Sequence, residues 1–291
     1  AAPGAMRIFW TRRAVRVLPP YWIATFVLVA IVIILRGGSF DSTHLAKSLA
    51  LWPYWTAGDF SLALPIMWVG WTLFFEMVFY FLFGLFVAFR RPVAIGLTVL
   101  ALVALVAAGQ IFQPQNAPLW MATRPVALVF IAGMLMALWR ERGHTAPGFV
   151  RWAALVLAVA IPLLLDKPID YAPVRTDYLL WAAIPGILLS FAVMGGEIRW
   201  PRPALVDRLG DISFALYLLH VPAAHFWTFV WQALLPPGGA WGFMVTLVIG
   251  TVIVSWLFFL WVERPMTRFL NGKFGAAKSP VASPVASPAA L

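Results

Sequence analysis

The stretch Gly70-Trp71-Thr72-Leu73-Phe74-Phe75-Glu76-Met77-Val78-Phe79-Tyr80 is an apolar run that contains a single acidic residue. It lies in a longer apolar segment, 68–89, and a helix of roughly 20 such residues crosses a hydrocarbon core about 30 Å thick. The whole chain has the same character, because 63% of its 291 residues are hydrophobic and only 11% are charged. Soluble domains are about 25% charged. We therefore predict an all-α fold, a polytopic membrane helix bundle, and exclude a soluble monomer.

Similar apolar runs recur along the chain. They predict about eight transmembrane helices, at 15–35, 68–89, 93–112, 124–139, 149–165, 178–195, 212–233 and 241–262. Segment 45–57 is apolar but short, and it contains Lys47 and Pro53. We interpret it as a re-entrant or interfacial segment rather than a crossing.

The basic residues follow this topology. Eight crossings with a cytoplasmic N-terminus put most of the 21 Lys and Arg residues inside, and leave outside only Arg36, Lys47, Arg124, Lys167 and Arg175. This asymmetry is the positive-inside pattern of a membrane protein. We expect both termini to be cytoplasmic and the membrane to be a bacterial inner (plasma) membrane. The net charge of +10 thus reflects topology, and we expect no nucleic-acid partner.

The sequence contains few signals of other chemistry. There is no cysteine, which excludes thiol nucleophiles and disulfides. No glycine-rich phosphate loop or HExxH motif occurs, and no two histidines share a helix face with a carboxylate at ligand spacing. We predict no metal site and no cofactor. Residues 1–272 form one membrane domain in this interpretation, and 273–291, rich in Ser, Pro and Ala, form a disordered tail.

Glu76 is the first candidate catalytic residue. A carboxyl group inside an apolar helix is costly, so it faces the bundle interior or a water-filled cavity and has a partner. Thr72 and Tyr80 lie four residues before and after it, on the same helical face. The alternative is a carboxyl that only locks helix packing.

His220 is the second candidate catalytic residue. Ser213, Tyr217 and His220 are spaced by four and three residues, so they line one helical face. At about 1.5 Å per residue, His220 and Glu76 each lie roughly 12 Å from opposite edges of the membrane core, and they could share one chamber if their helices are neighbours. Histidine is the usual general base. The alternative is a histidine hydrogen-bonded to a backbone carbonyl beside Pro222.

Arg13 and Arg16 form a candidate anion site. Their spacing of three residues presents two guanidinium groups to one phosphate. They precede Pro19-Pro20, which we expect to bend the chain as it enters the bilayer. The alternative is simple anchoring by the positive-inside rule.

Four stretches together resemble the acyltransferase-3 family of integral membrane acyltransferases. They are Phe9-Trp10-Thr11-Arg12-Arg13-Ala14-Val15-Arg16-Val17-Leu18-Pro19-Pro20-Tyr21, then Trp71-Thr72-Leu73-Phe74-Phe75-Glu76 through Phe79-Tyr80, then Leu209-Gly210-Asp211-Ile212-Ser213-Phe214-Ala215-Leu216-Tyr217-Leu218-Leu219-His220, and finally Val262-Glu263-Arg264-Pro265. Each is weak alone, but their order and spacing extend over nearly the whole chain.

The resemblance implies transfer of an acyl group, commonly acetyl, from acyl-CoA as co-substrate to a hydroxyl of a sugar, glycan or lipid-linked saccharide. It associates Arg13 and Arg16 with binding of the donor, in agreement with the anion-site interpretation. Glu76 and His220 remain the candidate catalytic residues, with Tyr80, Tyr217 and Ser213 in supporting positions. The expected partners are the acyl-CoA donor, the carbohydrate acceptor and membrane lipids.

The chain also departs from the family pattern. Family members usually have about ten membrane helices and a proposed catalytic histidine in the first, within a basic-x10-His motif. The first two helices have no counterpart in this sequence, so we expect an N-terminally truncated relative or a fragment. The alternatives to an O-acyltransferase are a proton-coupled secondary transporter, with Glu76 and His220 as a proton relay, and an inactive membrane scaffold derived from the enzyme.

Overall fold

The computed structural model describes residues 4–56, 62–165, 179–196, 203–234 and 239–274. Helices dominate these residues, as predicted for an all-α protein. The strands among them form one two-stranded antiparallel sheet, in which Tyr54 pairs with Ala63 and Trp55 with Leu62. The elements are α1 (Ala5–Arg36), α2 (Ser42–Leu49), β1 (Tyr54–Trp55), β2 (Leu62–Ala63), α3 (Gly70–Phe86), α4 (Arg91–Phe112), α5 (Ala117–Ala122), η1 (Pro125–Leu128), α6 (Val129–Glu141), α7 (Gly148–Leu164), η2 (Leu179–Ala183), α9 (Ile184–Met194), α10 (Pro203–Asp211), α11 (Ser213–Leu234), α12 (Ala240–Phe258), η3 (Phe259–Glu263) and α13 (Arg264–Phe274).

Every predicted span coincides with a helical segment in its described residues. By length and composition, four helices of the described chain can cross a membrane: Ala5–Arg36, Arg91–Phe112, Ser213–Leu234 and Ala240–Phe274. Shorter apolar helices occupy Gly70–Phe86, Gly148–Leu164 and Trp181–Met194. The chain is therefore built as an integral membrane helix bundle, and the number of eight crossings stays a prediction.

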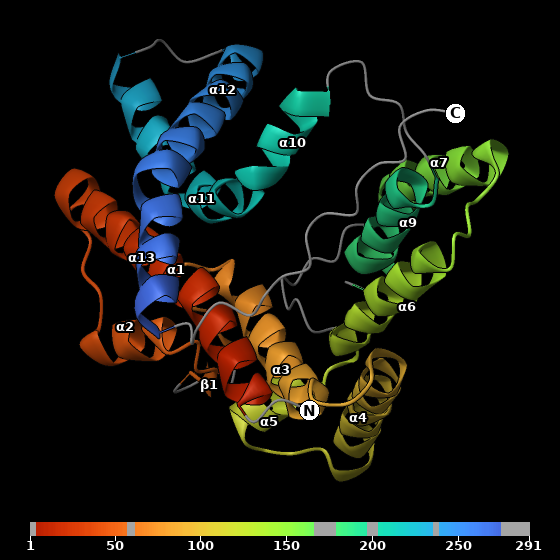
Figure 1. The fold of residues 1–291 in the computed structure, drawn as a ribbon. Coiled ribbons are helices and arrows are strands. Elements are labelled where there is room, and N and C mark those ends of the chain that lie inside the picture. The colour runs from red at the N-terminus through yellow and green to blue at the C-terminus, as the bar shows by residue number, and fades with distance from the viewer. Residues whose placement is uncertain (1–3, 57–61, 166–178, 197–202, 235–238, 275–291) are drawn as a thin grey trace.

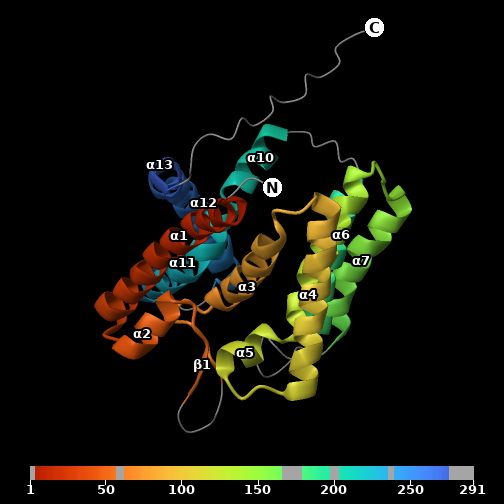
Figure 2. The same cartoon turned by 60° about the horizontal axis from the view of Figure 1, so that its bottom comes forward.

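The helices form two groups, joined by α3 (Figures 1 and 2). One group contains α1, α11, α12 and α13, and the other contains α4, α6, α7 and α9. Helix α3 packs against α1 on one side and α4 on the other. Its side chains divide accordingly, because Leu73 is buried in the core with Tyr21 and Leu218, while Phe75 is buried with Leu102 and Met121.

In the second group, the helix ends that the topology predicts on one side of the membrane lie close together. Arg91 at the start of α4 forms an ion pair with Glu141 at the end of α6. The backbone N–H of Ala146 donates to the carbonyl oxygen of Gly195 at 2.6 Å. The segments predicted to be cytoplasmic in this group therefore lie at one end of it. The orientation of that end in the membrane stays a prediction.

Segment 45–57 does not cross the bundle. Its helix α2 has eight residues and is therefore about 12 Å long, which is too short for the hydrocarbon core. The hydroxyl of Tyr21 donates to the carbonyl oxygen of Ser48, and the indole N–H of Trp22 donates to that of Leu49, both at 2.9 Å. Since Tyr21 lies about 22 Å along α1 from Arg36, α2 runs back along the side of α1, with Ser48 as its buried residue, and β1 follows. The choice between a re-entrant and an interfacial segment stays a prediction.

Two further sequence predictions concern α1 and α13. Helix α1 stays helical through Pro19 and Pro20. Helix α13 extends to Phe274, slightly beyond the predicted domain boundary at residue 272. The rest of the predicted tail, 275–291, lies outside the described residues.

Candidate functional site

The carboxyl of Glu76 is held by Tyr80, one turn later on α3. The Tyr80 hydroxyl donates to Glu76 Oε1 at 2.5 Å. Helix α1 fixes Tyr80 from the other side, because the indole N–H of Trp10 donates to the Tyr80 carbonyl oxygen at 3.0 Å. The Arg13 guanidinium carbon lies 5.1 Å from the centre of the Tyr80 ring, a cation–π geometry. The structure therefore brings three predicted site residues, Arg13, Glu76 and Tyr80, together.

Arg13 and Arg16 lie on α1 with different exposure. Arg13 is half-buried against Phe9 and Tyr80, and Arg16 is exposed. The positive charges of both act on Tyr80, and that of Arg16 also acts on Glu263. Among the described residues neither guanidinium forms an ion pair with a carboxylate. The anion site at Arg13 and Arg16 requires guanidinium groups without carboxylate partners, and its occupation by an anion stays a prediction.

Tyr217 connects α11 to the start of α3. Its hydroxyl and that of Thr72 are hydrogen-bonded to each other. Both hydroxyls also lie within hydrogen-bond distance of the Val69 carbonyl oxygen, at 2.7 Å for Tyr217 and 3.0 Å for Thr72. The predicted supporting residue Tyr217 thus contacts the same helix that carries Glu76.

The tautomer of His220 follows from its hydrogen bond. Nδ1 lies 2.7 Å from the carbonyl oxygen of Tyr217. Because a carbonyl can only accept, Nδ1 carries the hydrogen, and in the neutral ring Nε2 is the nitrogen with a free lone pair. The ring also meets Trp68 edge to face, with centroids 6.3 Å apart. This arrangement is compatible with a base at Nε2 and with the packing interpretation, which requires the same bond.

We use the name α3 stripe for Trp68, Thr72, Glu76 and Tyr80, which are spaced by four residues. Trp68 lies in the turn just before α3, and the other three lie on one side of the helix. One end of the stripe contacts His220 and Tyr217 of α11, and the other end contacts Arg13 of α1. Glu76 is a member of the stripe and His220 contacts its opposite end at Trp68, so the two candidate residues lie beside the same stripe. Ser213, the remaining predicted residue, is exposed at the first position of α11 and takes no part in these contacts.

Sequence reasoning missed Trp68 and underestimated Glu263. Trp68 has the four-residue spacing of the stripe, and that spacing is the signal that could have found it. Glu263 is 7% exposed, and its Oε2 has no hydrogen-bond partner among the described residues. A buried carboxyl oxygen without a partner costs free energy. Because the charge of Arg16 acts on Glu263, this carboxyl is a further polar group near the predicted anion site.

The described contacts of His225 and His44 lie away from the stripe. His225, five residues beyond His220 on α11, has a buried Nδ1 without a partner in the described chain, and its carbonyl accepts from Arg36 at 3.3 Å. His44 Nε2 lies 2.9 Å from the Leu64 carbonyl oxygen. The described residues contain no group of three His, Asp or Glu side chains that could hold a metal ion.

Comparison with known proteins gives two matches. Residues 3–260 match the acyltransferase-3 family profile, described as Acyltransferase domain. The chain is also 32% identical over 273 residues to the exopolysaccharide production protein ExoZ of Rhizobium meliloti (strain 1021), an alignment that covers 89% of this chain and 81% of that relative. No solved structure matches.

Proposed function

The chain belongs to the acyltransferase-3 family, and from that premise we propose that this membrane acyltransferase transfers an acyl group, acetyl in the first instance, from acyl-CoA to a hydroxyl of a polysaccharide or lipid-linked saccharide. The relative's name, which refers to exopolysaccharide production, supports a carbohydrate acceptor. The observation that carries the proposal is the convergence of Arg13, Tyr80 and Glu76 at the contact between α1 and α3.

The reaction is a direct transfer. The oxygen of the acceptor hydroxyl bonds to the thioester carbonyl carbon, the carbon–sulfur bond breaks, and the hydroxyl proton passes through a base to the departing thiolate. The described residues of the site present no cysteine or activated serine as a covalent nucleophile, so a transfer without an acyl-enzyme is favoured.

The proposed roles of the residues are supported by their positions. Arg13 and Arg16 pair with the phosphates of coenzyme A, since a guanidinium forms strong charge-assisted hydrogen bonds to phosphate oxygens. Glu76 from the α3 stripe and His220 from the neighbouring α11 orient and deprotonate the reacting groups, with Tyr80 positioning Glu76 and Tyr217 positioning His220. Ser213, exposed at the first position of α11, makes none of the described contacts of the site, and its supporting role stays a prediction.

The proposal includes a topology. Eight crossings with both termini cytoplasmic put Arg13 and Arg16 on the side where acyl-CoA is made, and put α5 and the sheet on the opposite side of a bacterial inner membrane. The charge asymmetry of the chain supports this orientation. The acceptor then meets the donor along the α3 stripe.

The test uses purified protein in nanodiscs, acetyl-CoA with a labelled acetyl group, and a deacetylated exopolysaccharide. We expect label on the polysaccharide and one free thiol for each acetyl group transferred. Proton flux without dependence on acetyl-CoA would support the transporter instead, and absence of both activities would support the scaffold.

The same assay separates the two interpretations of His220. We expect His220→Ala to lower turnover by about 100-fold, within the usual range for loss of a general base, and His225→Ala on the same helix to leave it nearly unchanged. Equal effects of the two substitutions would show that His220 serves packing alone.

A further inference from the structure

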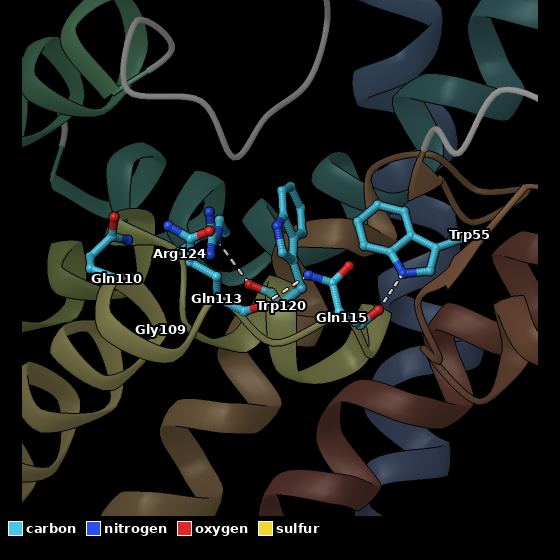
Figure 3. Close-up of a pocket in the computed structure, with 7 residues that line it drawn as sticks. All are labelled: Trp55, Gly109, Gln110, Gln113, Gln115, Trp120 and Arg124. Atoms are coloured by element: carbon cyan, nitrogen blue, oxygen red, sulfur yellow. Dashed lines mark hydrogen bonds between the residues drawn. The ribbon is translucent and has the colours of Figure 1, made fainter.

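A second polar region lies away from the α3 stripe. A cavity of about 590 Å³ opens where the end of α4 meets α5 and β1, and its walls carry Trp55, Gln110, Gln113, Gln115, Trp120 and Arg124. Figure 3 shows these side chains, which come from β1, α4, α5 and the segments that follow α4 and α5. We call this set the rim pocket. Three of the four glutamines in the whole chain belong to it.

The aromatic walls of the rim pocket are fixed in place. The indole N–H of Trp55 donates to the Gln115 carbonyl oxygen at 2.7 Å. The Trp55 and Trp120 rings meet edge to face, with centroids 5.1 Å apart at an angle of 67°. Gln113, the residue that follows α4, has a positive φ of 44°, and its carbonyl accepts from the Gln115 side chain at 3.2 Å. The two indoles are therefore positioned by the backbone turn that follows α4.

Gly109 closes the floor of the pocket. A Cβ on this glycine would overlap Thr123 at the end of α5, so only glycine lets α4 and α5 approach this closely. The pocket thus has a built floor as well as positioned walls.

The chemistry of these walls matches a sugar ring. The flat faces of tryptophan rings carry negative charge density and attract polarised C–H groups, which line one face of a pyranose. A glutamine amide donates and accepts at once, as a sugar hydroxyl requires of its partners. All three glutamines are exposed and can reach a ligand.

Arg124 favours a ligand that carries negative charge. Its guanidinium lies 4.4 Å from the centre of the Trp120 ring, and its Nε donates to the Trp120 carbonyl oxygen at 2.9 Å. It forms no ion pair with a carboxylate among the described residues. Its remaining N–H groups can form charge-assisted hydrogen bonds to a bound carboxylate.

We propose that the rim pocket is an acceptor subsite that binds a carboxylate-bearing sugar unit of the glycan, with the ring against Trp55 and Trp120 and the carboxylate on the remaining N–H groups of Arg124. The assignment of the bound sugar to the acceptor rests on the proposed function above. The binding itself does not need acyl-CoA and can be measured without it.

The test is calorimetric titration of the protein, in nanodiscs of zwitterionic lipid, with a tetrasaccharide that contains one glucuronic acid. The matched probe is the same tetrasaccharide after reduction of its carboxyl group to the alcohol. We expect the acidic form to bind at least about 10-fold more tightly to the unaltered protein, as one charge-assisted pair allows. Equal affinity for the two forms, or binding of neither, would overturn the proposal.

The variants locate the preference. Arg124→Gln should remove the difference between the two probes, and Gln110→Ala, an exposed substitution, should weaken both by a few-fold. Arg142→Gln, which removes an exposed charge at the far end of α6, should change neither. If Arg142→Gln weakens binding as much as Arg124→Gln, bulk charge explains the preference and the pocket assignment fails.

The binding assay and the acyl-transfer assay together separate failure of the subsite from failure of the proposed function. If the acidic probe is preferred but no acyl transfer is detected, the proposed function fails and the subsite stands. If transfer occurs and the two probes bind equally, the subsite fails alone. Competition by phosphatidylglycerol in the nanodisc, with no response to either saccharide, would assign Arg124 to a lipid phosphate and would also overturn the proposal.

Discussion

The α3 stripe and the rim pocket use polar residues in opposite ways. In the stripe, polar groups partner one another within the bundle, as Tyr80 does with Glu76 and Tyr217 with Thr72. In the rim pocket the amides are exposed, and the charge of Arg124 has an aromatic ring rather than a carboxylate beside it. Groups that fix each other suit chemistry at a defined position, whereas exposed groups with donors and acceptors left over suit recognition of a ligand that pairs with them. We therefore assign transfer to the first region and acceptor binding to the second.

The largest effect that tests this division is expected at the donor end of the stripe. Replacing both Arg13 and Arg16 by Gln should raise the KM for acyl-CoA by about 100-fold, since each charge-assisted hydrogen bond is worth roughly 1.5–3 kcal/mol. The affinity for the acidic tetrasaccharide should stay the same. Steady-state kinetics and the calorimetric titration measure the two quantities.

The matched control for this pair is the double variant Arg7→Gln with Arg12→Gln. It removes the same charge from two exposed positions of the same helix. If the control raises the KM for acyl-CoA equally, the local anion site does not exist and only the total charge of the cytoplasmic end matters.

The next effect concerns the positioning of Glu76. Tyr80→Phe removes the hydroxyl that donates to Glu76 Oε1 but keeps the ring beneath Arg13. We expect kcat to fall by about 10-fold, as for loss of one hydrogen bond of roughly 1.5 kcal/mol, with the KM for acyl-CoA unchanged. Tyr54→Phe, at the sheet, is the control. A change in KM without a change in kcat would place Tyr80 in donor binding instead.

A smaller effect, on the stability of the protein, is expected at two glycines of α4, where alanine should act in opposite directions. Gly109→Ala forces a Cβ against Thr123 and should destabilise the protein by about 1–3 kcal/mol, with weaker saccharide binding. Gly96→Ala meets nothing within 4 Å and should stabilise the helix by about 0.5–1 kcal/mol. Thermal unfolding in detergent compares them, and equal shifts would contradict the close approach of α4 and α5.

The smallest expected effect is at Trp55. Trp55→Phe keeps an aromatic ring but removes the hydrogen bond to the Gln115 carbonyl. We expect saccharide affinity to fall by a few-fold, consistent with a hydrogen bond of about 1 kcal/mol, and turnover at saturating acceptor to stay constant. A loss of turnover at saturation would join the rim pocket to the reaction centre.

The sequence predicts the helices and those contacts of the site that lie within one helix. Helix positions depend on the length and hydropathy of local runs, so the segments that became α1, α4 and α11 were found directly. The contact of Glu76 with Tyr80 follows from four-residue spacing within one helix. The contact of Thr72 with Tyr217 does not, because it depends on how α3 and α11 pack.

The rim pocket lay beyond sequence reasoning for the same cause. Trp55 and Trp120 are 65 positions apart in the printed sequence, and only the return of the chain after α2 and the turn after α4 bring their rings together. The cluster of Gln110, Gln113 and Gln115 at the end of an apolar run is the one local signal in the sequence. It indicates a binding site only once Trp55 and Trp120 are known to lie beside it.

The most direct measurement of the central claim compares Glu76→Gln and Arg124→Gln in one steady-state assay with varied acceptor. The account predicts that Glu76→Gln lowers kcat by about 100-fold and leaves acceptor affinity unchanged, while Arg124→Gln raises the acceptor KM by about 10-fold and leaves kcat unchanged. Glu141→Gln, in an exposed ion pair, should change neither. Identical changes in kcat and KM for the first two variants would contradict the division of transfer and recognition between the two regions.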